Sequence, residues 1–261
     1  MFWLKMSFPN FKNKHAKEPV FTPREFLEYQ RRRGKVLKKK IPDGVIFVYS
    51  SRLLDYILKH NKTEKIKDYF YGTFYSLKNT DSRIGIVAGF GIGAPVVVTL
   101  MEELIASGVK RFISIGEAGT LQKNLKIGSI VVCEKAIRDE GTSHHYLKPS
   151  KYAYASRSLT QKIEQVLLGN NEKYVVGTSW TIDAPYRETV AEARKYQKEG
   201  VATVEMEAAA IFAAARYRKV EAGAIFTVSD SLAELKWKPK FHRSAANWET
   251  LFSVAKDVLS N

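Results

Sequence analysis

Two glutamates and a methionine stand together in Glu205-Met206-Glu207, at the start of an alanine-rich helix predicted over residues 204–218. Positions two apart do not share a face of a helix, so we expect one carboxylate to point into a cleft and the other to brace the turn. These residue types suit a sugar, because a carboxylate accepts hydrogen bonds from two neighbouring hydroxyls while a thioether packs on the ring. The ordinary alternative is that both acids only complement the positive end of the helix.

An aspartate follows the apolar stretch 224–228, in Ser229-Asp230-Ser231. A carboxyl group with apolar neighbours on one side holds a proton more readily than one in water, which suits general-acid chemistry. The alternative is an aspartate that caps the following turn.

A third candidate is the segment Gly89–Pro95, which fits the pattern G-x-G-x-x-A between a predicted strand, 84–88, and a predicted helix, 96–107. This is the context of a dinucleotide-binding turn, in which an acidic residue such as Glu117 would hold a ribose hydroxyl. The alternative is that the glycines only allow a tight turn from strand to helix.

Apolar, β-branched runs alternate with helical segments, which predicts a mostly parallel sheet covered by helices on both faces. The expected fold class is therefore α/β, a doubly wound three-layer α/β/α arrangement in a single domain. Ligands bind beyond the carboxyl ends of such strands, so we expect Gly89–Pro95, Gly116–Gly119 and Ser229–Ser231 to meet at one site. The predicted strands are 45–49, 84–88, 112–115, 129–133, 174–178 and 222–228, and the predicted helices are 23–33, 53–60, 96–107, 159–168, 204–218 and 248–259.

Five different motifs follow one another along the chain between about residues 84 and 231. They are Gly89-x-Gly91-Ile92-Gly93-x-Pro95 with Glu103-Leu104, Gly116-x-x-Gly119-x-Leu121-Gln122, Arg138-Asp139-Glu140-Gly141-Thr142-Ser143, Glu205-Met206-Glu207 and Ser229-Asp230. This combination resembles the nucleoside phosphorylase family, which includes uridine phosphorylase and hexameric purine nucleoside phosphorylase. The resemblance displaces the dinucleotide interpretation of the glycine loop.

The resemblance implies a doubly wound fold with a mixed central sheet that cleaves the N-glycosidic bond of nucleosides, in a homo-oligomer such as a dimer or hexamer. By position, Glu207 would bind the ribose 2′- and 3′-hydroxyls, Met206 would pack on the sugar, and Glu205 would face the base side. Asp230 matches the aspartate with which purine-cleaving members protonate the departing base at N7.

Further substrate-binding positions follow from the same resemblance. The stacking phenylalanine of the family aligns with Pro185, so Tyr186 or Trp180 would supply the aromatic ring. The remaining expected substrate-binding residues are Gly91, Gly119, Arg138 and His144.

Three departures from the family concern phosphate. The Gly-Asp-Pro-x-Arg loop reads Val48-Tyr49-Ser50-Ser51-Arg52, Ser114 stands where an arginine is usual, and Glu117 stands where a serine or threonine is usual. A carboxylate there would repel phosphate by several kcal/mol in a poorly hydrated cleft. Either phosphate is held differently, with Arg52 as the surviving ligand, or water is the nucleophile and Glu117 orients or deprotonates it.

Composition and charge limit the remaining classes of protein. Of 261 residues, 45% are hydrophobic, which excludes a wholly disordered chain, and the lack of a long apolar run predicts a cytoplasmic protein with no membrane segment. The single cysteine, Cys133, excludes a disulfide framework and a cysteine-based zinc site, and no other metal is indicated.

Residues 1–40 carry twelve Lys or Arg against three Glu, a large share of the net charge of +15. We interpret them as a basic N-terminal extension with one helix, followed by a catalytic domain over residues 41–261. A solvated lysine-rich surface explains this charge better than a nucleic-acid site, because no recognition module accompanies it.

The sequence therefore predicts cleavage of nucleosides by phosphorolysis to free base and ribose 1-phosphate, with phosphate as co-substrate, no cofactor, and a purine preference from Asp230. One alternative is a hydrolytic nucleosidase. The other is a family member without catalysis that binds nucleosides or nucleic acid.

Overall fold

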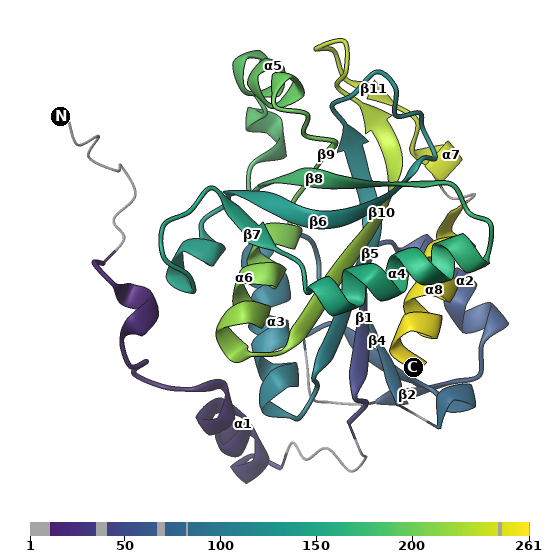
Figure 1. Ribbon diagram of the computed structural model, residues 1–261. Coiled ribbons are helices and arrows are strands. Elements are labelled where there is room, and N and C mark those ends of the chain that lie inside the picture. Colours follow the sequence, from purple (N-terminus) through teal and green to yellow (C-terminus); the bar gives the residue numbers. More distant parts are fainter. Residues whose placement is uncertain (1–10, 35–40, 67–70, 82, 245–246, 261) are drawn as a thin grey trace.

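A mixed β-sheet forms the centre of the molecule (Figure 1), as the resemblance to the nucleoside phosphorylase family implies. The computed structural model describes residues 11–34, 41–66, 71–81, 83–244 and 247–260. In these residues the strand order along the sheet is β11-β10-β6-β8-β9-β5-β1-β4-β3-β2, with β7 paired to β6.

Four parallel strands position the site. They are β1 (Gly44–Val48), β4 (Ile84–Ala88), β5 (Arg111–Thr120) and β10 (Glu221–Ser231), and their pairs are β4–β1, β1–β5 and β5–β10. Every residue of β1 and β4 is buried, which explains their continuous apolar sequences. Because these strands are parallel, their carboxyl ends lie at one edge of the sheet.

The other half of the sheet curls into a ring. β10 also pairs with β6 (Ile130–Asp139), which pairs in turn with β8 (Tyr174–Ile182), and β9 (Thr203–Glu205) joins β8 to β5. This closure brings Glu205 in β9 to the same end of the sheet as the end of β10.

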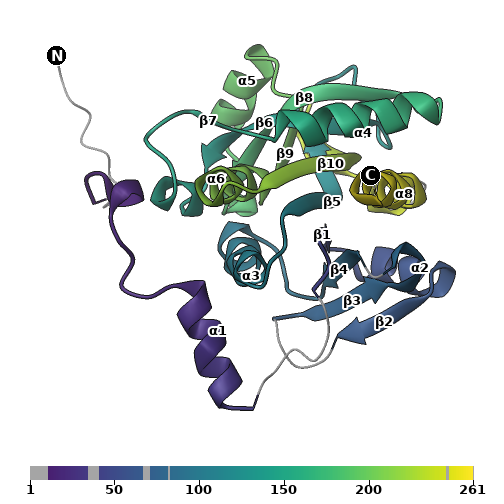
Figure 2. The same cartoon turned by 60° about the horizontal axis from the view of Figure 1, so that its bottom comes forward.

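Helices cover both faces of the sheet, which confirms the predicted layers (Figure 2). On one side α3 (Ala94–Ala106) packs against α6 (Ala208–Arg218), where the alanines of α6 allow close approach. On the other side lie α2 (Ser51–His60), α4 (Arg157–Gly169) and α8 (Trp248–Ser260).

Smaller elements complete the described chain. The sequence did not predict the edge hairpin β2 (Thr63–Ile66) and β3 (Thr73–Leu77), nor β7 (Tyr152–Tyr154), α5 (Val190–Lys198), β11 (Lys238–Pro239) and α7 (Phe241–Ser244). Short 3₁₀ turns lie at Lys14–Ala16, Lys78–Thr80, Thr142–His145 and Pro185–Arg187.

Three predicted boundaries are wrong at the site, one of them the end of the strand predicted over 222–228, which continues as β10 through Ser231. The helix predicted from residue 204 begins only at Ala208, because residues 203–205 pair as β9 and Glu205 accepts the backbone N–H groups of Glu207 and Ala208. The segment Gly116–Gly119, predicted as a loop, continues β5 because it pairs with Phe226–Asp230 of β10.

The helix predicted near the N-terminus is present as α1 (Pro23–Arg32), with a capping box between Thr22 and Glu25. It lies beside α3. Residues 1–10 and 35–40 of the proposed basic extension lie outside the described residues. Among the described helices, none has both the length and the apolar character needed to cross a bilayer.

Candidate functional site

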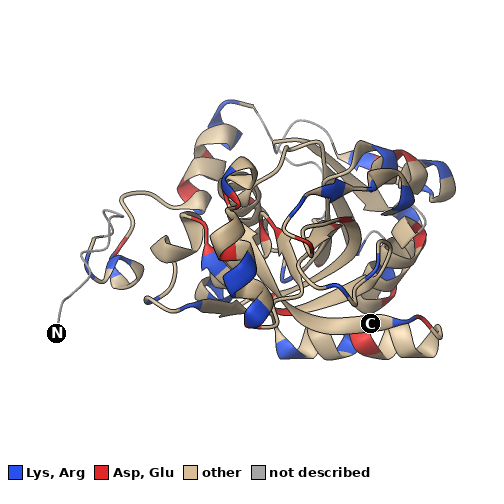
Figure 3. Cartoon of the chain, turned by 90° about the horizontal axis from the view of Figure 1, so that it is seen from above, with Lys and Arg blue, Asp and Glu red and all other residues tan. Residues whose placement is uncertain are grey.

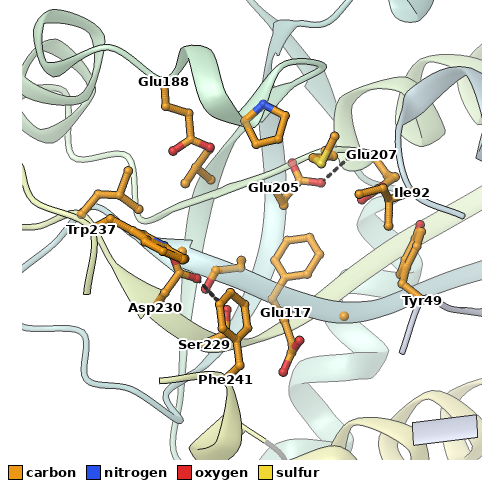
Figure 4. A pocket seen from close by; sticks show the side chains of 18 of the residues that line it. Tyr49, Ile92, Glu117, Glu188, Glu205, Glu207, Ser229, Asp230, Trp237 and Phe241 are labelled. Carbon is orange, nitrogen blue, oxygen red and sulfur yellow. Dashed lines mark hydrogen bonds between the residues drawn. The ribbon is translucent and has the colours of Figure 1, made fainter. Parts of the chain in front are cut away.

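A cavity of about 1000 Å³ lies at the carboxyl ends of β1, β5 and β10 (Figure 4). It brings together five carboxyl groups from separate elements and two basic side chains. The acids are Glu117, Glu188, Glu205, Glu207 and Asp230, and the basic residues are Arg52 and Lys236. Seen from above, Lys and Arg segments lie mostly on the outer helices, while Asp and Glu segments lie both on those helices and near the middle (Figure 3).

Glu207 lines the cavity on the side of the glycine loop. Its Oε1 accepts the backbone N–H of Gly93 at 2.5 Å, so the glycine loop positions the carboxylate rather than a dinucleotide. Gly93 has φ +104°, a conformation that favours glycine. Burial, with the neighbouring charge of Glu205 as a second cause, raises the pKa of Glu207 to about 8.

Glu205 braces the turn, as one of the two acids was expected to do. Its Oε2 accepts the N–H groups of Glu207 and Ala208 at 2.8 and 2.7 Å, and its Oε1 accepts the hydroxyls of Thr181 and Ser179 at 2.5 and 3.1 Å. Burial raises the pKa of Glu205, while these donors favour its ionised form. The carboxylate therefore holds Met206 and Glu207 in place at the cavity wall.

Asp230 lies across the cavity, at the end of β10. Ser229 Oγ donates to its Oδ1 at 2.7 Å, and Trp237 Nε1 donates to its Oδ2 at 3.0 Å. Gly119 is opposite Asp230 in the β5–β10 pair, and a Cβ at this glycine would lie 3.0 Å from Oδ2 and 2.9 Å from Leu232 Cδ1. Gly119 thus makes room for the carboxyl group.

On the side of the cavity near β1, the sequence departs from the residues with which the family binds phosphate. This side is lined by an aromatic ring and an acid. Tyr49 stands in the altered loop after β1, its hydroxyl lies 3.0 Å from Ser114 Oγ, and its ring packs against Gly116. Burial raises the pKa of Tyr49 well above its usual value, so the ring is a neutral phenol. Glu117 also lines this side, and Arg52 stands at the start of α2, largely exposed.

Of the two residues expected to stack on a base, only Tyr186 lines the cavity. Trp180 is fully buried, donates Nε1–H to Asp139 Oδ2 at 2.8 Å and packs on Tyr196, so it belongs to the core and not to the cavity. Tyr186 stands at the cavity rim but is 100% exposed. Trp237, Phe241 and Trp248 are further aromatic side chains that line the cavity.

Three other expected substrate-binding residues lie outside the cavity. The Arg138 guanidinium is buried and donates to Ser143, Lys148 and Ser150, so it organises the loop after β6. His144 Nε2 lies 3.1 Å from the carbonyl oxygen of Arg138 in the same loop. Gly91 is exposed, with φ +92°, and shapes the turn before α3.

The structure adds cavity residues that sequence reasoning missed. Glu188 lies just before α5, and burial, together with the charges of Asp230 and Glu192, raises its pKa to about 7. Trp237 reaches Asp230 from seven residues along the chain. The capping pattern Thr189-x-x-Glu192 was readable and would have placed Glu188 at a helix start, but no local signal pointed Trp237 at Asp230.

Among the residues that the structure describes, no group of three or more His, Cys, Asp or Glu side chains is arranged to hold a metal ion. The cavity offers hydrogen-bond acceptors and aromatic surface, which are groups that recognise a sugar and a flat ring.

Comparison with known proteins gives curated relatives of two kinds. The guanosine phosphorylase of Halorubrum lacusprofundi is 33% identical over 146 residues, which are 56% of this chain and 61% of that protein. A DeoD-type purine nucleoside phosphorylase of Caldanaerobacter subterraneus subsp. tengcongensis is 36% identical over 148 residues, 56% of this chain and 64% of that protein. The matches thus span less than two thirds of the relatives' own length.

Solved structures share the fold over a longer range. An AMP nucleosidase from Bacteroides thetaiotaomicron superposes with a TM-score of 0.74 at 21% identity, over 91% of this chain and 96% of that one. A purine nucleoside phosphorylase from Toxoplasma gondii gives 0.73 at 20% identity, over 85% and 90%. The family model described as the phosphorylase superfamily matches residues 44–254, and the chain belongs to this superfamily.

Proposed function

We propose that the protein cleaves the N-glycosidic bond of purine nucleosides, with phosphate as the acceptor of the ribosyl group. The observation that carries this proposal is the placement of Glu207 with Met206 on one side of a single cavity and Asp230 on the other. A nucleoside bound by its sugar at Glu207 directs its base toward Asp230. The relatives named as guanosine and purine nucleoside phosphorylases support the same substrate class.

In this reaction a phosphate oxygen forms a bond to C1′ of the ribose as the bond from C1′ to N9 of the purine breaks. The electron pair of the broken bond goes to the base, and N7 takes up a proton from solvent by way of Asp230. The products are the free base and ribose 1-phosphate. The ionised form of Glu207 accepts hydrogen bonds from the 2′- and 3′-hydroxyls and stabilises the positive charge that develops on the sugar.

Hydrolysis is a second candidate, favoured by the side of the cavity near β1. The hydroxyls of Tyr49 and Ser114 are hydrogen-bonded to each other at the positions where the family resemblance places phosphate ligands. Glu117 adds a carboxyl group on the same side. A carboxylate in that position can take a proton from water. The AMP nucleosidase among the structural neighbours shows that the fold occurs in proteins named for that activity.

Product analysis separates the two candidates. Purified protein is incubated with inosine, guanosine, adenosine and uridine, with and without phosphate, and base, free ribose and ribose 1-phosphate are measured. Base release that needs phosphate and yields ribose 1-phosphate supports phosphorolysis. Release of free ribose at an equal rate without phosphate supports hydrolysis, and no release from any nucleoside would overturn both.

A further inference from the structure

A second cavity, of about 830 Å³, lies between the N-terminal segment and the body of the protein. Side chains between residues 14 and 26 form one wall, and α3, the loop after β6 and the end of α6 form much of the other. α1 lies beside α3 (Figure 2), and the turn Lys14–Ala16 contacts the turn Thr142–His145. Among the described residues, none lines both this cavity and the nucleoside cavity. The first wall precedes residue 44, where the match to the phosphorylase superfamily begins, so that match does not include it.

Glu103 of α3 lines this second cavity with an uncompensated carboxyl group. The residue is 5% exposed, and within the described part of the chain no hydrogen bond or ion pair reaches its carboxyl oxygens. Burial raises its pKa to about 7, and no charged neighbour contributes to the shift. The adjacent Glu102 differs, because Arg218 Nε donates to its two carboxylate oxygens at 3.0 and 2.7 Å. A buried carboxylate without a partner costs free energy, so the position of Glu103 favours a ligand that brings a positive charge.

Aromatic and apolar side chains make up much of the remaining wall. Tyr146 and Tyr217 meet edge to face, with 5.5 Å between their ring centroids, and line the side formed by the body of the protein. Phe21 and Phe26 line the side formed by the N-terminal segment, and Val98 follows Glu103 on the exposed side of α3 that borders the cavity. Such walls bury the apolar part of a small ligand, and the faces of aromatic rings attract a cation.

We propose that this second cavity binds a small organic amine, with the ammonium group at Glu103 and the apolar body against Phe26 and the two tyrosines. The ammonium group compensates the charge of the carboxylate and donates hydrogen bonds to it, and such charge-assisted bonds are stronger than neutral ones. An alcohol of the same shape brings no charge, and a carboxylate would place a second negative charge beside Glu103. The inference does not depend on the proposed reaction, because the nucleoside cavity has other lining residues.

The charged surroundings of Glu103 define how binding responds to pH. The charged and titratable side chains that line the cavity with it are Lys14, Lys17 and Glu18 from the N-terminal segment, Glu102 on α3, and His145, Asp183 and Arg218 from the body. Lys14 and Lys17 are exposed, and Arg218 is bound to Glu102. At pH 8 Glu103 is ionised and the amine is protonated. At pH 5.5 Glu103 is protonated, so the preference for an amine over an alcohol should fall.

Calorimetry on the full chain at pH 8 tests the proposal with 2-phenylethylamine, 2-phenylethanol and 3-phenylpropionate. We expect the amine to bind at least about tenfold more tightly than the alcohol, and the carboxylate to bind more weakly than either. Glu103→Gln keeps the shape of the side chain and removes its charge, so the preference for the amine should fall to about twofold or less. Glu28→Gln, exposed on α1 and outside both cavities, should retain the preference.

The carboxyl groups of the nucleoside cavity are the other place where an amine can bind. The same titration is therefore repeated with Glu207→Gln, which removes a carboxyl group of that cavity. We expect this variant to bind 2-phenylethylamine as tightly as the wild type does. An affinity that falls in Glu207→Gln and not in Glu103→Gln places the amine in the nucleoside cavity and overturns the proposal.

The remaining outcomes also decide the question. Equal affinity for the amine and the alcohol, or a preference that survives in Glu103→Gln, overturns the proposal. So does the absence of binding by 2-phenylethylamine and by its homologues benzylamine and 3-phenylpropylamine. Thermal melting shows whether Glu103→Gln folds; if it does not, the wild type decides, because a preference that is the same at pH 5.5 and pH 8 excludes a role for the charge of Glu103.

Discussion

Replacing Glu207 with glutamine should stabilise the protein while destroying its activity. The carboxylate is 8% exposed, and its pKa is raised to about 8 from an ordinary value of 4.5, with burial as the largest cause and Glu205 next. The folded state therefore binds a proton that the unfolded state releases between pH 4.5 and 8. Because the folded pKa is the higher one, this group costs stability as the pH rises through that window.

The magnitude follows from the two pKa values. Each pH unit between them costs about 1.4 kcal/mol, so the penalty is roughly 1 kcal/mol at pH 5, 3 at pH 7 and 5 at pH 9. Glutamine has the same shape and cannot ionise, and its carbonyl oxygen can still accept the N–H of Gly93. The variant should thus gain about 4 kcal/mol relative to the wild type between pH 5 and pH 9.

Urea denaturation of wild type and Glu207→Gln at pH 5, 7 and 9 checks this, with Glu28→Gln on the exposed face of α1 as a control for the loss of one charge. In the pH 9 samples, where Glu207 of the wild type is ionised, kcat/KM for a nucleoside should fall about a hundredfold, because the charged acceptor for two ribose hydroxyls is gone. A stability difference that does not change with pH would refute the reasoning, since it would mean that water reaches Glu207 and its ionisation costs the fold nothing.

Three further substitutions test the rest of the cavity. Asp230→Asn should reduce turnover of inosine about a hundredfold or more, yet spare an N7-methylated nucleoside that needs no proton to leave, as parallel kinetics would show. Gly119→Ala should lower both kcat and the free energy of unfolding, the latter by about 1–3 kcal/mol in urea denaturation, because the new Cβ would lie against Asp230 Oδ2 and Leu232. Trp237→Phe keeps an aromatic ring but removes the N–H that binds Asp230; we expect a lower kcat with little change in KM, and an unchanged kcat would contradict a positioning role for this tryptophan.

The fold was predictable where a continuous apolar run indicates a strand that is buried on both faces. The strand at residues 84–88 appears at the predicted residues because all five are buried and a glycine turn follows. The hairpin of β2 and β3 was missed because β2, at the edge of the sheet, and β3 beside it are only partly buried and carry polar residues, so they lack a continuous apolar run.

The geometry of the proposed sugar side of the site was predictable for a different reason, since its residues are adjacent in the chain. Glu205, Met206 and Glu207 form one motif, and their division into a bracing acid and an acid in the cavity follows from their spacing. The base side was not predictable, because Glu188 and Trp237 join Asp230 only through the folding of segments far apart in sequence. Trp180 is the opposite case. It was expected to contact the base because it is an aromatic residue near a motif, but its side chain is buried in the core.

The charges of the cavity bear on which substrates it can accept. Five carboxyl groups line it against Arg52 and Lys236, and both basic residues are exposed at the rim. Such a wall suits a neutral nucleoside whose sugar becomes positive as the bond to the base breaks, because nearby carboxylates stabilise that charge. Above about pH 8, where Glu188 and Glu207 are ionised, the same wall disfavours a dianion, and a substrate with a 5′-phosphate would add its charge to those already present. Nucleosides should therefore be better substrates than their monophosphates, and any phosphate that enters as a nucleophile must approach from the Arg52 side of the cavity.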